Sequence, residues 1–372
     1  MEVAIPLIPN PLDAQKRPVR LSGELTGLTG LRGIAAFTVF VAHSRFEELV
    51  PVLRPICRFF EWHALAVDLF FMLSGFVLVH VYADKLGTAR KGSWRSYLAA
   101  RFARIVPLYL ITLLAALCVF LIGSFILKKW PAYITWETVI TNVFLIQNWP
   151  GFFHISINLP SWSLSVEFLC YLVLMPVALI LDKQVTRLGV ALLLIALLLA
   201  GRAVVEDSIM GWASLARGLT CFLAGTLLHR FYGSTSGRAL GTITVTGAAA
   251  FLVMRSLAAW AGLSSIWPLF SFPLLVLGLA SPVNTLVHRF FQCPIMLWLG
   301  DISYSAYLWQ GPVGMIIHYQ IRPRLNALPP AAHAIWMVCE IVLILFLSTV
   351  SYRRLEIPLR HWIRARLDPC AA

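Results

Sequence analysis

Charged residues are scarce in this sequence. Asp, Glu, Lys and Arg make up 13% of the 372 residues, whereas hydrophobic residues make up 59%. Soluble globular domains carry about 25% charged residues, so this balance excludes that class. The composition is that of a polytopic membrane protein.

The sequence also lacks the cysteine spacing of a metal site or a disulfide framework. Its seven cysteines are scattered, and four of them fall within predicted spans. We predict no bound metal ion. Residues 1–26 lack the apolar core of a secretory signal and are rich in Pro, which indicates a cytosolic tail.

Apolar stretches long enough to span a bilayer recur along the chain. They lie near 27–45, 64–82, 105–127, 162–181, 186–205, 212–232, 240–260, 263–281, 295–317 and 332–351. We therefore predict an all-α polytopic helix bundle with about ten transmembrane helices and both termini in the cytoplasm.

The net charge of +13 reflects topology rather than nucleic-acid binding. If the amino terminus is cytoplasmic, 20 of the 30 Lys and Arg lie on the inner side and nine in outer loops. The positive-inside rule favours that orientation. We divide the chain into a cytosolic tail (1–26), a membrane domain (27–352) and a basic cytosolic tail (353–372), and expect no nucleic-acid partner.

The first predicted helix carries Arg32 and His43, separated by a wholly apolar run. Eleven helical steps place the two side chains about 20° apart around the axis and about 16 Å apart along it. Ionisable groups inside a membrane are costly, and they are functional candidates for that reason. The alternative is a snorkelling arginine and a histidine hydrogen-bonded within the bundle.

Two carboxylates are expected near His43. Asp68 lies about one turn below the outer end of the second predicted helix, and Glu167 lies in the first two turns of the fourth. We predict that these three groups converge, because a neutral histidine held by a carboxylate is a suitable general base. The alternative is that both carboxylates are polar bridges between helices.

Arg101 and Arg104 lie three residues apart, on one face of a predicted inner helix over 92–104. Together with Arg32 they are expected to form a positively charged opening on the inner side of the bundle. Paired guanidinium groups suit phosphates, because each donates a fork of hydrogen bonds together with its charge. The alternative is that they bind anionic lipid and set the topology.

Five blocks of sequence resemble the membrane acyltransferase family 3, and together they cover nearly the whole chain. The blocks are LTGLRGIAAFTVFVAHS, ALAVDLFFMLSGFVL, RSYLAARFARIVPLY, TNVFLIQNW with PSWSLSVEFLCYL, and LGDISYSAYLWQGPV. Members of that family O-acylate sugars of lipopolysaccharide, exopolysaccharide and related glycans. Each motif is loose, but the order of all five makes the resemblance strong.

The resemblance implies a multi-pass enzyme of the inner (plasma) membrane that transfers an acyl group from cytosolic acyl-CoA to an outward-facing hydroxyl. It assigns Arg32, Arg101 and Arg104 to the CoA phosphates and makes His43 the catalytic residue. Glu167 or Asp68 would fix the tautomer of His43. No cofactor would be bound permanently.

Recognition of the acceptor, a surface glycan or a lipid-linked oligosaccharide, is expected on the outer side. The segment 128–161 is rich in aromatic residues, which predicts a belt at the lipid headgroups. As acceptor-binding candidates we take Asn148, Trp162, Tyr307 and Gln310. Many family members carry a histidine where this chain has Gln310, and an amide cannot titrate near neutral pH.

Two other functions fit some of these features. A transporter of an anionic or acylated solute would also bury charges in a helix bundle, but it tends to show paired halves with broken helices, which this sequence lacks. A non-catalytic relative that binds acyl-CoA or a lipid-linked glycan is the other possibility. Intact His43, Arg101 and Arg104 favour the enzyme.

Overall fold

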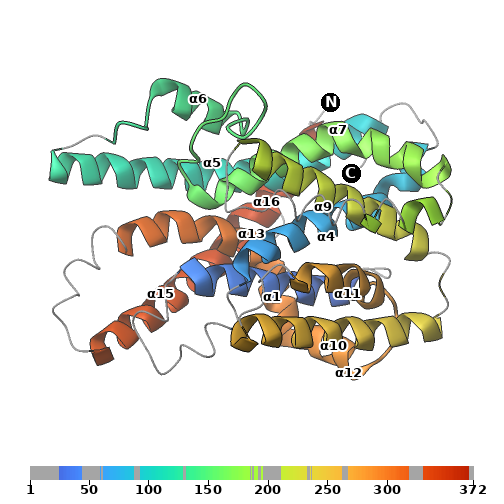
Figure 1. Ribbon diagram of the computed structural model, residues 1–372. Coiled ribbons are helices and arrows are strands. Elements are labelled where there is room, and N and C mark those ends of the chain that lie inside the picture. Colours follow the sequence, from blue (N-terminus) through green and yellow to red (C-terminus); the bar gives the residue numbers. More distant parts are fainter. Residues whose placement is uncertain are drawn as a thin grey trace, which may run out of the picture.

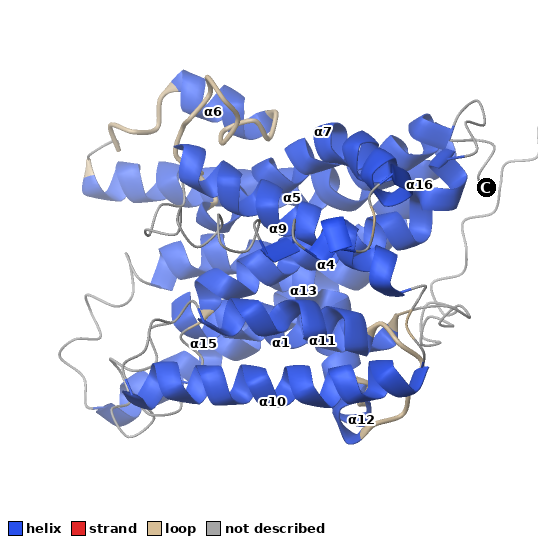
Figure 2. Cartoon of the chain, turned by 45° about the vertical axis from the view of Figure 1, so that its right-hand side comes forward, coloured by secondary structure: helices blue, strands red, loops and turns tan. Residues whose placement is uncertain are grey.

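A computed structural model describes residues 25–43, 59, 62–87, 93–128, 131–184, 186, 188–191, 194–195, 211–232, 235, 237–261, 267–317 and 330–367. Within these residues every regular element is a helix, and none is a strand (Figure 1, Figure 2). The predicted all-α fold is confirmed.

In the described part of the chain, eight long helices form the bundle. They are α1 (Thr26–His43), α4 (His63–Gly87), α5 (Ser93–Leu127), α7 (Trp162–Gln184), α9 (Gly211–Tyr232), α10 (Gly237–Ala261), α13 (Pro294–Met315) and α15 (Pro330–Ser351). The shorter elements are α6 (Trp136–Val143), η3 (Leu159–Ser161), η4 (Trp267–Ser271), α11 (Phe272–Leu279), α12 (Leu286–Phe291), η6 (Tyr352–Glu356) and α16 (Ile357–Leu367). Helical residues occur in every predicted span, although most of the span 186–205 lies outside the described residues.

Among the described residues, four helical stretches are long and apolar enough to cross a membrane, which supports a membrane protein. They are His63–Ala83, Trp94–Ile126, Leu159–Val177 and Gly237–Trp260. The total of ten spans, the position of the termini and the domain boundaries stay predictions.

The helix α5 differs from the sequence prediction. An inner helix over 92–104 and a separate span over 105–127 were expected, but one helix runs from Ser93 to Leu127 with Pro107 inside it. A proline removes one backbone hydrogen bond, and the tertiary contacts of α5 outweigh that loss. Arg101 and Arg104 therefore lie in the interior of a long helix, close to its neighbours.

Glycines bring α1 and α13 into close contact. A Cβ atom at Gly33 would lie 2.8 Å from the backbone nitrogen of Gly300, and one at Gly30 would lie 1.8 Å from the carbonyl oxygen of Phe291. Small residues allow helices to pack this closely in membranes. Phe291 is the last residue of α12, which precedes α13. Further along, Phe40 of α1 packs in one cluster with Val313 of α13, so the contacts advance in the same sense and the two helices run in the same direction.

The helix α6 lies beyond one edge of the bundle, beside α5, while α10 forms the opposite edge (Figure 1, Figure 2). The segment 144–161, which follows α6, turns back into the bundle. The side-chain amide of Asn158 donates to Thr112 Oγ1 and to the carbonyl oxygen of Leu308, at 3.2 Å each. Thr112 is fully buried in the middle of α5. The start of α7 therefore lies inside the bundle rather than at its surface.

Candidate functional site

Three arginines line a cavity between α1, α4, α5, α7 and α13, whose space, together with the solvent at its opening, is about 760 Å³. Arg32 comes from α1, and Arg101 and Arg104 come from one face of α5. Glu167 is the one carboxylate among the described lining residues. Three positive charges and one negative charge give this arginine cavity a net charge of +2. The prediction that these arginines come together is confirmed.

Arg101 is held by tyrosines. Its Nη2 donates to Tyr82 Oη at 3.2 Å, and its guanidinium lies 5.3 Å from the ring centre of Tyr82 and 5.9 Å from that of Tyr171. Its Nε is shielded from solvent and has no hydrogen-bond partner in the described chain. Cation–π contacts fix the plane of the guanidinium without using its N–H groups. Arg101 therefore keeps a donor for a bound anion.

Arg104 and Arg32 also keep donor capacity. Arg104 makes no hydrogen bond or ion pair to the residues that the structure describes. Arg32 Nη2 donates to Ser303 Oγ at 3.4 Å, a long contact. Guanidinium groups held in an apolar bundle favour an anionic ligand, because no protein carboxylate neutralises them fully.

Glu167 lines the arginine cavity. Its Oε1 accepts hydrogen bonds from Ser74 Oγ and from Tyr171 Oη, the latter at 2.5 Å. The predicted convergence of His43, Asp68 and Glu167 stays a prediction.

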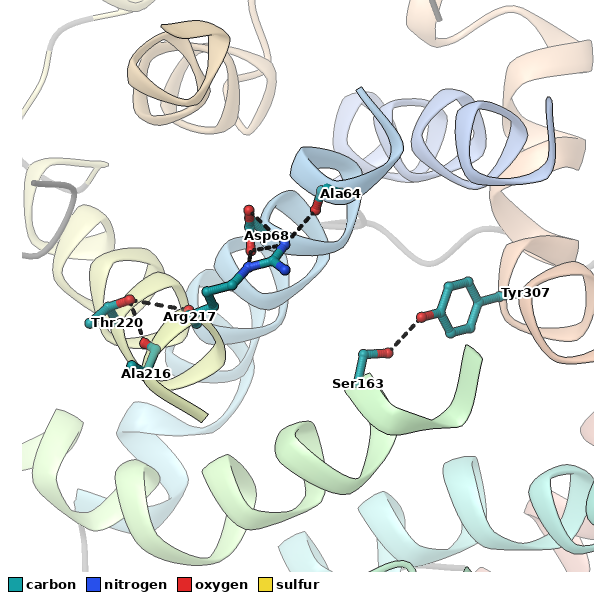
Figure 3. A network of polar contacts seen from close by, with 7 residues as sticks. All are labelled: Ala64, Asp68, Ser163, Ala216, Arg217, Thr220 and Tyr307. Carbon is teal, nitrogen blue, oxygen red and sulfur yellow. Dashed lines mark hydrogen bonds and ion pairs between the residues drawn. The ribbon is translucent and has the colours of Figure 1, made fainter. Parts of the chain in front are cut away.

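Asp68 is paired with Arg217 (Figure 3). Arg217 Nε and Nη2 donate to the two carboxylate oxygens at 3.1 and 3.2 Å, and Nη2 also donates to the carbonyl of Ala64 at 2.9 Å. Both side chains are buried. This pair joins α4 to α9, which is the polar bridge that the sequence left open as the alternative.

His43 is the last residue of α1, and it is exposed to solvent. Its Nδ1 lies 2.7 Å from the carbonyl oxygen of Val39, and its ring centre lies 5.9 Å from that of His63 in an edge-to-face arrangement. A carbonyl oxygen can only accept, so Nδ1 carries the proton in the neutral ring and Nε2 is the basic nitrogen. The Val39 carbonyl thus sets the tautomer of His43, a role that the sequence analysis assigned to Glu167 or Asp68.

The four acceptor-binding candidates lie in different surroundings. Tyr307 Oη and Ser163 Oγ are 2.7 Å apart, and both residues line the arginine cavity (Figure 3). Gln310 follows Tyr307 by one turn of α13. It is buried, and neither its amide nitrogen nor its amide oxygen has a hydrogen-bond partner in the described residues.

Asn148 and Trp162 are enclosed by protein. The side chain of Asn148 donates to the carbonyl of Trp162 and accepts from Ser214, at 3.4 Å each. The Trp162 ring lies 5.6 Å from the guanidinium carbon of Arg217 and 6.4 Å from the ring of Phe71. Both residues are buried, so neither side chain faces the lipid headgroups directly.

The sequence analysis did not identify the polar lining residues Ser303 and Tyr304. Ser303 and Tyr307 lie four residues apart and share one face of α13. Tyr304 Oη donates to the carbonyl of Ile105 at 2.6 Å, which ties α13 to α5 beside the cavity. The polar spacing in DISYSAY was the signal that could have identified them.

The family model described as an acyltransferase domain matches residues 25–353. The chain belongs to acyltransferase family 3. The resemblance drawn from the five sequence blocks is confirmed, and the family favours an acyltransferase over a transporter. The matched range includes all the residues that line the arginine cavity, as well as His43.

Characterised relatives agree with this placement. The chain is 34% identical to acyltransferase MdmB of Streptomyces mycarofaciens over 160 residues, which is 40% of this chain and 38% of that protein. It is 23% identical to O-acetyltransferase OatA of Staphylococcus aureus over 369 residues, covering 90% of this chain and 57% of the relative. The chain thus spans less than two thirds of the length of either relative. No solved structure matches it.

Proposed function

We propose that this member of acyltransferase family 3 is a multi-pass O-acyltransferase of the inner (plasma) membrane. It moves an acyl group, most simply acetyl, from cytosolic acyl-CoA to a hydroxyl of an extracytoplasmic glycan or lipid-linked sugar. The observation that carries the proposal is the arginine cavity with its net charge of +2. An acyl donor that carries several phosphates supplies the missing negative charge.

The donor end of the site is formed by Arg32, Arg101 and Arg104. Phosphates accept the paired N–H groups of guanidinium better than a point charge, and such charge-assisted bonds are strong in a low dielectric. The unpartnered Nε of Arg101 supports this assignment. In the proposed orientation the amino ends of α1 and α5 face the cytosol, so the donor enters from that side.

The acceptor end is at His43. Arg32 and His43 lie eleven residues apart on α1, which is about 16 Å along the axis. The pantetheine arm of CoA is an extended chain between the phosphates and the thioester, and it bridges a separation of this kind. The thioester would then lie beside the imidazole while the phosphates stay with the arginines.

In the proposed reaction His43 Nε2 takes the proton of the acceptor hydroxyl. The hydroxyl oxygen attacks the thioester carbonyl, the carbon–sulfur bond breaks, and the proton passes from His43 to the departing thiolate of CoA. The Val39 carbonyl keeps Nε2 as the basic nitrogen. Glu167 acts at the donor end instead, where it holds Ser74 and Tyr171.

Gln310 is the acceptor-side residue with the strongest support. His43 and Gln310 each lie ten residues beyond the contact of Gly33 with Gly300, which places them at a similar height on parallel helices. A buried amide without partners has lost its hydrogen bonds to water. A ligand hydroxyl or carbonyl would restore hydrogen bonds to it. We assign it to binding of the acceptor or of the thioester carbonyl.

The test is incorporation of label from radioactive acetyl-CoA into cell-envelope glycan. Membranes with the native chain, His43→Ala and the control His361→Ala, an exposed histidine on α16, are compared at matched expression. Label that is lost only with His43→Ala supports the proposal. Persistence of label in His43→Ala would remove His43 as the base, and absence of label with the native chain across several acyl donors would favour a transporter.

A further inference from the structure

The arginine cavity ends where three helices bring their last lining residues together. Among the described lining residues, Phe70 is the first on α4, Ser163 is the first on α7, and Tyr307 is the last on α13. The ring centres of Phe70 and Tyr307 are 6.2 Å apart with the rings tilted by 59°, and Ser163 Oγ lies 2.7 Å from Tyr307 Oη (Figure 3). These three side chains form one contiguous layer, which we call the end wall of the cavity.

Hydrogen bonds fix the end wall in place. Ser163 Oγ donates its single proton to the carbonyl oxygen of Pro160 at 3.3 Å, so Tyr307 is the donor in the contact between the two hydroxyls. Tilted aromatic pairs attract each other beyond the area that they bury. Tyr307 is therefore held from two sides, by the ring of Phe70 and by the oxygen of Ser163.

The end wall is separated from Arg101 by most of the cavity. The ring of Tyr171, another lining residue of α7, lies 5.9 Å from the guanidinium carbon of Arg101. Tyr171 follows Ser163 by eight residues, which is about 12 Å along the helix. A donor whose phosphates bind the arginines therefore extends its other end, the acyl group, toward the end wall.

The end wall also lies between the cavity and His43. His43 does not line the cavity. It lies at a similar height to Gln310, which follows Tyr307 by three residues, or about 4.5 Å along α13. In the conformation observed, an acyl group in the cavity meets the end wall before it reaches the imidazole.

The surroundings of the end wall are apolar. The lining residues next to it are Leu73 of α4 and Leu164 of α7, both buried. The lining carboxylate, Glu167, lies one turn beyond Ser163. The cations of the cavity are the three arginines, which the proposed function assigns to phosphates. A second carboxylate on the acyl group would thus be buried without a cation of its own, at a high cost.

We propose that the end wall selects the acyl group of the donor and that Phe70 is its main specificity-determining residue. It admits a short, uncharged acyl group such as acetyl, and it excludes longer or carboxylated ones. This inference rests on the proposed function and names its substrate class. The end wall moves aside when the thioester advances to His43, whereas a longer chain lacks space already when the donor binds.

The experiment uses the full chain in nanodiscs of phosphatidylcholine. We would measure the Kd of acetyl-CoA, butyryl-CoA and succinyl-CoA without acceptor, and kcat/KM with cell-envelope glycan as acceptor. Butyryl and succinyl groups both have four carbons, so they separate length from charge. The native chain should favour acetyl-CoA over butyryl-CoA about tenfold, the value expected for two methylene groups without apolar space. Phe70→Ala should remove most of that preference and leave succinyl-CoA a poor donor.

Phe168→Ala is the matched control. Phe70 and Phe168 are both partly buried and pack against the same core, but Phe168 stacks on Trp149 and does not line the cavity. This variant should keep the native preference for acetyl-CoA. Unfolding temperatures of all variants are compared, and if Phe70→Ala is unstable, Phe70→Leu decides, because it removes less volume and should relax the preference in the same direction.

The outcomes separate this inference from the proposed function. Equal use of acetyl-CoA and butyryl-CoA by the native chain, or an unchanged preference in a folded Phe70 variant, would overturn the inference while CoA binding and acyl transfer stand. Rescue of succinyl-CoA together with butyryl-CoA in Phe70→Ala would overturn the exclusion of charge. Failure of the native chain to bind CoA or to transfer any acyl group would overturn the proposed function.

Discussion

Arg217 of α9 donates two hydrogen bonds, at 3.1 and 3.2 Å, to the carboxylate of Asp68 on α4. Removal of either partner leaves an uncompensated charge inside the bundle. We expect Asp68→Leu to cost about 3–5 kcal/mol of stability, measured as a lower unfolding temperature in detergent. The double variant Asp68→Leu with Arg217→Met should recover most of that loss, because both charges are then gone.

The same pair of variants separates a structural Asp68 from a catalytic one. If Asp68 only joins the helices, the double variant should retain acyl transfer. A stable double variant without any transfer would instead restore the catalytic role that the sequence suggested.

The helices were predictable because their signal is local. Apolar runs of sufficient length identify α4, α5 and α10 from composition alone. The inward course of segment 144–161 was not predictable in this way. It depends on contacts of Asn158 with Thr112 and with Leu308, which lie 46 and 150 residues away. Aromatic residues there resemble a headgroup belt by composition, although Trp162 is buried.

In the candidate site, too, features with a local sequence signal were predictable and features that depend on long-range contacts were not. Arg101 and Arg104 were predictable because their spacing places them on one face of a helix. The partner of Glu167 was only half predictable: Tyr171 lies one turn away on the same helix, whereas Ser74 comes from α4. The packing of α16 against α5 depends on tertiary contacts, so the sequence showed only a basic tail there.

Arg101→Ala should weaken donor binding. Its loss removes a cavity charge and an unpartnered Nε–H, so we expect KM for acetyl-CoA to rise about tenfold or more, with a smaller change in kcat. Initial rates in purified enzyme measure this. Arg95→Ala is the control, because Arg95 is exposed on the same helix and does not line the cavity. An equal rise in KM for both variants would indicate a general surface-charge effect.

Gln310→Leu should separate stability from activity. The native amide is buried with both polar atoms unpartnered, and a leucine of similar volume removes that desolvation cost. We expect an unfolding temperature equal to or above that of the native chain, together with a loss of about tenfold in kcat/KM, which corresponds to about 1.4 kcal/mol of transition-state binding. A stable variant with full activity would show that Gln310 binds neither the acceptor nor the thioester.

Asn158→Ala should loosen the inward segment. The Asn158 amide donates to α5 through Thr112 and to α13 through the Leu308 carbonyl, and it is fully buried. Its removal leaves the Leu308 carbonyl without that donor, so we expect a loss of about 1–3 kcal/mol. Because η3 and the first turn of α7 follow directly, Ser163 and Glu167 should shift, and hydrogen exchange should increase over 144–167. Asn284→Ala is the matched control, since Asn284 contacts the exposed Arg289 at the surface. Faster exchange confined to residue 158 itself would mean that the segment is held by its apolar contacts instead.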